Sequence, residues 1–215
     1  ASNGVSSDAS GNVYIAGQTD GILSGAGFGG RDSFVAKYDS LGNQIWLNQF
    51  GTSAFDVALG VSADDFGNAY VTGFTYGSLG GPAAGDQDAF LAKYDSFGSQ
   101  VWIRQLGSVA LDQAIEVSTD MLGNVYISGV TQGSLGGMHV ASGDAFVSKF
   151  SDSGSLVWTK QFGSGLNERS FSVSADNLGY VYIGGDILDN PNGGPSTDTD
   201  AFVNKYDSAG NLLWS

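Results

Sequence analysis

The segment KYDSLGNQIW, Lys37–Trp46, occurs four times in the chain in nearly the same form. The other copies are KYDSFGSQVW at Lys93–Trp102, KFSDSGSLVW at Lys149–Trp158 and KYDSAGNLLW at Lys205–Trp214. Taken alone, such a segment fits a calcium loop, a phosphate-binding loop or a β-hairpin. These alternatives lead to different functions, so the surrounding sequence has to choose between them.

A period of 56 residues runs through the whole chain without an insertion. Four residue types recur at this interval: Trp46, Trp102, Trp158 and Trp214; Tyr14, Tyr70, Tyr126 and Tyr182; Gly17, Gly73, Gly129 and Gly185; Phe34, Phe90, Phe146 and Phe202. Such a period is typical of repeat architectures, in which each unit packs against its neighbours. We expect units at residues 4–59, 60–115, 116–171 and 172–215.

Each unit predicts four β-strands. In the second unit, runs of β-branched and aromatic residues flank two short connectors, Asp64–Gly67 and Asp95–Gly98, and no helical period is present. Aspartate first and glycine fourth suit a type I turn followed by a left-handed glycine. A calcium loop would need a closing glutamate, and a phosphate loop would need a following helix, so the hairpin is preferred.

The pattern VSxDxxGNxYxxG followed by DAFxxKYDxxGxxxW resembles the bacterial β-propeller repeats called SBBP repeats, over essentially the whole chain. The YDSxGNxxW part is also similar to the tryptophan-docking segment of quinoprotein-type propellers. Two positions depart from the pattern: Tyr180 replaces the recurring asparagine, and the third copy has SDSG for DSxG. The resemblance implies an all-β fold, a β-propeller of four four-stranded antiparallel blades, standing alone or forming part of a larger propeller.

A meander of four strands places both aspartate–glycine turns on one face of the propeller. The longer, variable connections then lie on the opposite face, at residues 19–31, 75–87, 131–143 and 187–199. Binding residues are often found on such loops, so we expect ligands there.

The recurring tryptophans and lysines have two possible roles each. The tryptophans fit packing between blades better than sugar stacking, because they occupy one strand position within apolar runs. The lysines Lys37, Lys93, Lys149 and Lys205 would be buried between blades and would need oxygen partners. We expect carbonyl or carboxylate partners, with the aspartates five residues earlier as candidates: Asp32, Asp88, Asp144 and Asp200.

The composition excludes several classes of partner. With 22 acidic and 8 basic residues the net charge is −14, which disfavours nucleic acid and anionic membrane surfaces but is compatible with cations. The absence of cysteine excludes disulfides and thiolate metal sites. No apolar run approaches the length of a membrane span. The chain starts at Ala1 without a signal-like segment, and we expect a processed product or part of a longer protein.

Candidate sites are few. His139 is the single histidine and has no acid or nucleophile pattern beside it, so we expect no catalytic residues, although a carboxylate pair stays open. No cofactor is expected with certainty; calcium is the candidate, at Asp186, Asp189, Asp198 and Asp200 in the fourth unit, with a solvated acidic loop as the alternative.

These observations favour a non-enzymatic scaffold that binds a protein partner or associates with copies of itself. The resemblance implies a secreted or cell-surface bacterial setting. A carbohydrate-binding, lectin-like propeller is one alternative. A lyase or hydrolase with a carboxylate pair in the central channel is another.

Overall fold

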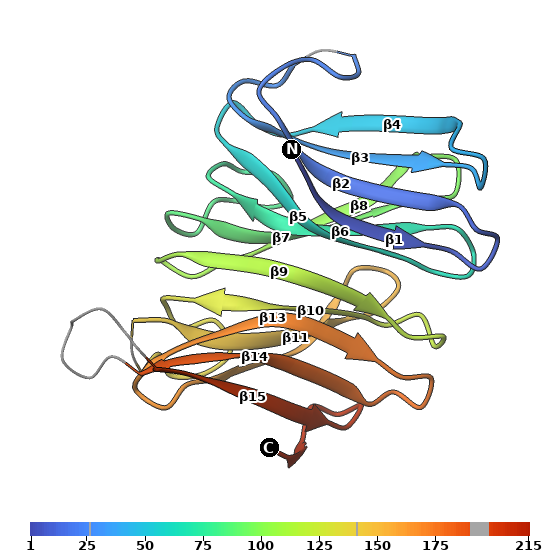
Figure 1. Ribbon diagram of the computed structural model, residues 1–215. Helices are drawn as coiled ribbons and strands as arrows, with labels where there is room; N and C mark the ends of the chain where they lie inside the picture. The colour runs from blue at the N-terminus through green and yellow to red at the C-terminus, as the bar shows by residue number, and fades with distance from the viewer. Residues whose placement is uncertain (26, 141, 190–197) are drawn as a thin grey trace.

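The computed structural model describes residues 1–25, 27–140, 142–189 and 198–215, and these contain strands and no helix (Figure 1). The strands are β1 (Ser2–Ser7), β2 (Val13–Thr19), β3 (Asp32–Tyr38), β4 (Gln44–Phe50), β5 (Asp56–Ala63), β6 (Ala69–Thr75), β7 (Asp88–Tyr94), β8 (Gln100–Leu106), β9 (Asp112–Thr119), β10 (Val125–Thr131), β11 (Asp144–Phe150), β12 (Leu156–Phe162), β13 (Asn167–Ala175), β14 (Val181–Asp189), β15 (Asp198–Tyr206) and β16 (Leu212–Trp214).

The strands form four antiparallel sheets, each a meander of four consecutive strands. The first strands of the sheets follow one another in space, because β5 packs against β1 and β9, and β13 packs against β9. Figure 1 shows the first and fourth sheets at opposite ends of this row. The predicted all-β propeller architecture is therefore confirmed, with the sheets as its blades.

The aspartate–glycine connectors are tight turns, as predicted. Asp39 Oδ1 accepts hydrogen bonds from the backbone N–H groups of Leu41 and Asn43, at 2.9 and 2.8 Å. Gly42 adopts a φ of 84°, which lies in the left-handed region that glycine tolerates. In the third blade Ser151 Oγ accepts the corresponding bond from Ser155 N–H at 3.2 Å, so the SDSG departure leaves the turn intact.

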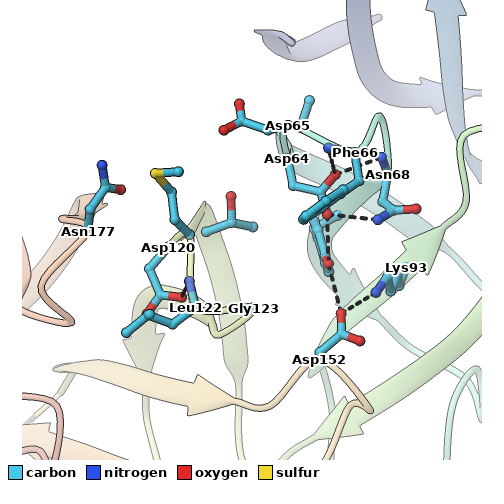
Figure 2. Close-up of a pocket in the computed structure, with 14 residues that line it drawn as sticks. Asp64, Asp65, Phe66, Asn68, Lys93, Asp120, Leu122, Gly123, Asp152 and Asn177 are labelled. Carbon is cyan, nitrogen blue, oxygen red and sulfur yellow. Dashed lines mark hydrogen bonds and ion pairs between the residues drawn. The ribbon is translucent and has the colours of Figure 1, made fainter. Parts of the chain in front are cut away.

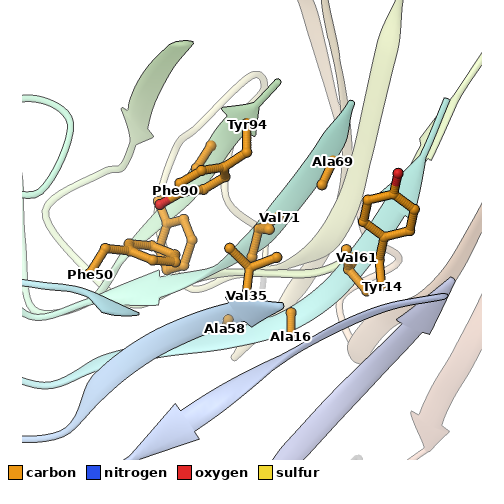
Figure 3. Close-up of a cluster of buried hydrophobic side chains, with 11 residues drawn as sticks. Tyr14, Ala16, Val35, Phe50, Ala58, Val61, Ala69, Val71, Phe90 and Tyr94 are labelled. Carbon is orange, nitrogen blue, oxygen red and sulfur yellow. The ribbon is translucent and has the colours of Figure 1, made fainter. Parts of the chain in front are cut away.

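Each interface between blades has its own hydrophobic core (Figure 3). Between the first two blades, Tyr14, Ala16 and Val35 of the first meet Val61 and Val71 of the second. Each interface is stabilised by roughly 25 cal/mol per Å² of apolar surface that it buries.

Three of the recurring tryptophans pack against the next blade. The indole N–H groups of Trp46, Trp102 and Trp158 donate to the carbonyl oxygens of Ser96, Asp152 and Ser208 at 3.2, 3.0 and 3.2 Å. Their predicted packing role is confirmed. Trp214 differs, because 48% of its surface is exposed.

Of the lysines in the first three blades, Lys93 and Lys149 contact the next blade, and Lys37 lies near the β1–β2 turn of its own blade. Lys93 Nζ donates to the Asp152 carboxylate, and Lys149 Nζ donates to the Ser208 carbonyl at 3.1 Å. Lys37 Nζ lies 3.9 Å from Asp8 Oδ2.

Lys93 and Lys149 have the predicted oxygen partners, a carboxylate and a carbonyl, but the candidate aspartates five residues earlier are not these partners. Residues separated by five along a strand point to opposite faces of the sheet, because side chains alternate. Asp88 instead accepts hydrogen bonds from Gln105 Nε2 at 2.6 Å and from Ala84 N–H at 2.7 Å.

Candidate functional site

The loop face of the propeller contains buried acids that hold the variable loops. Asp32 Oδ2 accepts from Gln49 Nε2 at 2.6 Å, and Gln49 Oε1 accepts from Leu23 N–H at 2.7 Å. The same network recurs around Asp88 and Asp144. The network attaches each variable loop to its blade through hydrogen bonds, and these bonds hold the loop in place.

A second buried acid lies beside each of these aspartates. Asp56 Oδ2 accepts from Thr52 N–H at 2.6 Å, and burial, with a contribution from the nearby Asp32 charge, raises the pKa of the Asp56 carboxyl above its ordinary value. Asp112 repeats this arrangement beside Asp88. Asp56 and Asp112 are fully buried, and each accepts hydrogen bonds from its own turn and from the threonine that ends the following strand, Thr75 or Thr131, so they act as loop supports.

His139 meets a single acid in the described part of the chain. His139 Nδ1 lies 3.3 Å from Asp144 Oδ2, and among the described residues no serine hydroxyl bonds to Nδ1 of this ring. Among the described residues, no group of three or more His, Cys, Asp or Glu side chains is placed to hold a metal ion.

The predicted calcium site falls largely outside the described residues. Asp186 Oδ1 lies 3.6 Å from Arg169 Nε, and Asp200 is exposed on β15. Asp189 and Asp198 are backbone partners at the ends of β14 and β15, but their side chains and residues 190–197 lie outside the described residues. The calcium site therefore stays a prediction.

A groove of about 700 Å³ opens between the second and third blades, on the face of the propeller that carries the aspartate–glycine turns (Figure 2). It is lined by the β5–β6 turn, the β9–β10 turn, Lys93 of β7 and Asp152 of the β11–β12 turn, with Asn177 of the fourth blade at its edge. This volume lies within the range of small-ligand and short-segment sites. The sequence placed binding on the opposite face, so this groove was missed.

A polar cluster forms one wall of the groove. The Tyr70 hydroxyl lies 3.2 Å from Asp64 Oδ2 and 3.3 Å from Asp152 Oδ1, and Lys93 Nζ donates to the same Asp152 carboxylate (Figure 2). Burial, together with the charges of Asp64 and Asp152, raises the pKa of the Tyr70 hydroxyl. Tyr70 therefore remains a protonated donor.

Asp152 is the residue that distinguishes this interface from the others. The corresponding turn position is Ser40, Ser96 or Ser208 in the other blades. At the first interface the Tyr14 hydroxyl donates to the Gly67 carbonyl at 2.9 Å, and this bond attaches the β5–β6 turn of the second blade to the first blade. At the second interface the Tyr70 hydroxyl turns to Asp152 instead. The SDSG departure was the sequence signal for this site, and it was assigned no function.

The rim of the groove is apolar and its charge is negative. Phe66, Met121 and Leu122 are 83%, 65% and 66% exposed. Four aspartates line the groove, Asp64, Asp65, Asp120 and Asp152, against a single lysine, Lys93. Asp64 and Asp120 accept N–H bonds within their own turns, whereas Asp65 is exposed to solvent. The arrangement suits a ligand that combines positive charge with apolar carbon atoms.

Comparison with protein-family models agrees with the blade geometry. A model described as SBBP, β-propeller repeat, matches residues 101–136, from β8 through β10. This segment of the chain is similar to an SBBP β-propeller repeat. The 56-residue period of the sequence corresponds to one four-stranded blade.

Two curated proteins are similar to this chain. The regulatory protein FlaEY of Caulobacter vibrioides is 27% identical over 175 residues, covering 73% of this chain and 18% of that protein. An uncharacterized WD repeat-containing protein of Acanthamoeba polyphaga mimivirus is 23% identical over 223 residues, covering 79% of this chain and 16% of that protein. The chain thus spans less than a fifth of either relative.

Solved structures share the fold at low sequence identity. A protein of unknown function from Bacteroides caccae has a TM-score of 0.51 and 9% identity, covering 99% of this chain and 80% of that one. The subtype N10 neuraminidase-like protein of A/little yellow-shouldered bat/Guatemala has a TM-score of 0.52 and 11% identity, covering 99% of this chain and 58% of that one. These likenesses concern the fold alone. Within the described residues, no helix has the length and apolar character needed to cross a membrane.

Proposed function

We propose that this SBBP chain is a non-enzymatic scaffold for protein interaction, and that the groove between its second and third blades binds a short basic segment of a partner protein. The observation that supports this is the acidic, apolar-rimmed groove at the interface where Asp152 replaces the recurring serine. A secreted or cell-surface bacterial setting belongs to the same proposal. Surface labelling of intact cells producing the native protein tests that setting.

The chemistry of a lysine or arginine side chain matches the groove at three points. Its cationic group is attracted to Asp65 and to the exposed side of Asp152, while its methylene groups cover Met121 and Leu122. The exposed ring of Phe66 accepts a cation over its face, which contributes about 0.5–1 kcal/mol at such a site. The net charge of −14 also raises the encounter rate with basic segments.

The test is fluorescence anisotropy with a labelled peptide of alternating lysine and leucine, and with a glutamate–leucine peptide as the comparison. We expect the basic peptide to bind with an affinity that falls as salt rises, because exposed charge pairs are screened. Phe66→Ser should weaken binding about fivefold, the equivalent of about 1 kcal/mol. Phe97→Ser is the matched control, since Phe97 is 85% exposed in an outer turn and does not line the groove.

Asp152→Ser gives a second, independent test. It restores the residue found at this position in the other three blades, so the turn and the fold should persist. Loss of basic-peptide binding with an unchanged melting curve would support the proposal. Equal binding by wild type, Phe66→Ser and Asp152→Ser would refute it.

A carbohydrate ligand is the second candidate, because an exposed aromatic ring such as Phe66 offers a stacking surface for a sugar. A glycan array screened with wild type and Phe66→Ser separates the two candidates. Salt-independent binding of a neutral oligosaccharide, lost in Phe66→Ser, would replace the peptide by a glycan as the ligand. Turnover of that oligosaccharide would instead revive the lyase or hydrolase alternative.

A further inference from the structure

Three pairs of buried acids lie between neighbouring blades, on the face that carries the variable loops. Each pair combines an acid at the start of the third strand of one blade with an acid at the start of the first strand of the next blade. The pairs are Asp32 with Asp56, Asp88 with Asp112, and Asp144 with Glu168. The exposed fractions of these residues run from 0% to 2%, so all three pairs are shielded from water.

A backbone hydrogen bond sets the two acids of each pair side by side. The N–H of the second acid donates to the carbonyl oxygen of the residue that precedes the first acid. These bonds run from Asp56 to Arg31 at 2.8 Å, from Asp112 to Gln87 at 2.7 Å and from Glu168 to Gly143 at 2.9 Å. The same geometry therefore recurs at all three interfaces.

The two carboxyl groups of a pair converge beside one glycine. A Cβ added to Gly51 would lie 2.8 Å from Asp32 Oδ1 and 2.9 Å from Asp56 Oδ2. In the third pair, a Cβ added to Gly163 would meet Asp144 Oδ1 and would lie 3.3 Å from Glu168 Oε2. The glycine has no side chain that would separate the facing oxygens.

One oxygen of the first acid in each pair has no hydrogen-bond donor. Asp32 Oδ2 accepts from Phe28 N–H at 3.0 Å and from Gln49 Nε2 at 2.6 Å, whereas Asp32 Oδ1 is buried and accepts no hydrogen bond. The equivalent atoms of the other pairs are also bare: Asp88 Oδ1, Asp144 Oδ1 and, on the second acid of the third pair, Glu168 Oε2. Buried polar atoms nearly always have a partner, so these oxygens require one.

The facing acid is surrounded by donors. Asp56 Oδ2 accepts from Thr52 N–H at 2.6 Å and from the Thr52 hydroxyl at 3.0 Å, and Asp56 Oδ1 accepts from the Thr75 hydroxyl. A hard metal cation needs six to eight oxygen ligands, and N–H groups are not ligands for it. A hydrogen on the bare oxygen, by contrast, needs only one acceptor, and Asp56 Oδ2 lies on the same side of Gly51.

No basic side chain balances the charge of the first two pairs. Among the residues that the structure describes, no lysine, arginine or histidine nitrogen forms an ion pair with either of them, whereas His139 lies beside Asp144 of the third pair. The other charged or titratable groups of the adjoining segments bond elsewhere or are exposed: Arg31 to Asp20, Arg169 to Asp186, Tyr76 to Gln87, and Asp86 in solvent. Two buried carboxylates that face each other without a cation repel strongly.

We propose that each pair holds one proton between its facing oxygens, Asp32 Oδ1 and Asp56 Oδ2 in the first pair, and that this carboxylic acid–carboxylate hydrogen bond joins neighbouring blades beneath the variable loops. As pH rises the proton passes to solvent and leaves two facing negative charges, so the joint weakens. The three joints lie on the opposite face from the groove and do not depend on a ligand there.

The direction of the pH effect follows from the acids of the second blade in each of the first two pairs. Burial, with a contribution from the facing acid, raises the pKa of the Asp56 and Asp112 carboxyls. A pKa that is higher in the folded chain gives a stabilisation that is complete below the unfolded pKa and is lost as pH rises through the folded pKa. We therefore expect stability to fall as pH rises above the ordinary aspartate pKa of about 3.9.

The test is urea unfolding between about pH 4 and about pH 9, with wild type and Asp32→Asn. The asparagine amide places an N–H donor at the bare oxygen at every pH, and its carbonyl oxygen keeps the bonds from Phe28 and Gln49. Asp32→Asn should therefore lose less stability than wild type as pH rises. A pKa difference of one between the folded and unfolded chains corresponds to about a tenfold difference in the unfolding equilibrium constant.

Asp86→Asn is the matched control. It removes the same single charge on the same face, but Asp86 is exposed, so this variant should follow the pH profile of wild type. If Asp32→Asn is less stable than wild type across the whole range and has the same pH dependence, both acids are ionised and the shared proton is wrong.

Infrared spectroscopy of the wild-type protein tests the proton without relying on a variant. The C=O stretch of a protonated carboxyl should persist near pH 7, where exposed acids are ionised, and should vanish on unfolding. Absence of this band from the folded protein would overturn the proposal. Stabilisation of wild type by added calcium, lost in Asp32→Asn, would also overturn it, because a cation would then occupy the place of the proton.

Discussion

Trp102→Ala and Trp214→Ala together test whether the blade interfaces carry the stability. Trp102 is 8% exposed and Trp214 is 48% exposed, a difference of 40% (48% − 8%) between two copies of one repeat position. For about 200 Å² of tryptophan surface at about 25 cal/mol per Å², this difference corresponds to about 2 kcal/mol. Trp102→Ala also removes the hydrogen bond to the Asp152 carbonyl, a further 1 kcal/mol or so.

We therefore expect Trp102→Ala to lower the free energy of unfolding by about 3 kcal/mol more than Trp214→Ala. Urea unfolding followed by circular dichroism measures the free energy of unfolding of both variants. Each variant requires coincident transitions by two probes, because repeat proteins do not always unfold in one step. A difference below about 1 kcal/mol would refute the packing argument.

Three further predictions follow from the turns and the acids. Gly98→Ala should destabilise the protein more than Gly42→Ala in the same urea assay. Both glycines have positive φ, but only Gly98 lies against the indole of Trp46. Equal effects of the two substitutions would contradict the close packing of Gly98 on this ring. Hydrogen bonds from Asn43 hold the pKa of Asp39 below its ordinary value, so Asp39 stabilises the turn above the unfolded pKa, and this contribution is lost as pH falls through the folded pKa. Asp39→Ala should thus be less stable than wild type at pH 7, with the gap narrowing in acid; a constant gap argues against the linkage. If the predicted calcium site is real, calcium at about 100 times its Kd should add about 2.7 kcal/mol, seen as a higher Tm that a chelator reverses; an unchanged Tm removes calcium from consideration.

The sequence was sufficient for the blade plan because each step of that plan is local. An aspartate and a glycine three residues apart define a turn through bonds within that turn, as Asp39 and Gly42 do. Strand identity follows from β-branched and aromatic runs, and the 56-residue period then fixes how many blades the residues supply. None of these steps requires knowledge of what lies on the neighbouring blade.

The lysine partners and the groove depend on contacts between blades, and here local reasoning failed. Lys93 meets Asp152, 59 residues later in the chain, because the β11–β12 turn of the third blade lies against the second blade, which carries Lys93 on β7. Asp88, the candidate five residues before Lys93, points to the other face of the sheet and belongs to the loop network. The recurring spacing alone therefore suggested the wrong aspartate.

The groove shows how a regular repeat can acquire a single special position. Three tryptophan–glycine contacts and their surrounding core need the same residues in every blade, so the shared pattern mainly describes packing. A residue that departs from the pattern without disturbing the turn is free to serve another purpose, and Asp152 is such a residue, since Ser151 takes over the turn bond. Its carboxylate bonds to Tyr70 and Lys93, whereas at the first interface Tyr14 bonds to the Gly67 carbonyl. In this protein the copies that agree build the frame, and the copy that differs places charge beside an open groove.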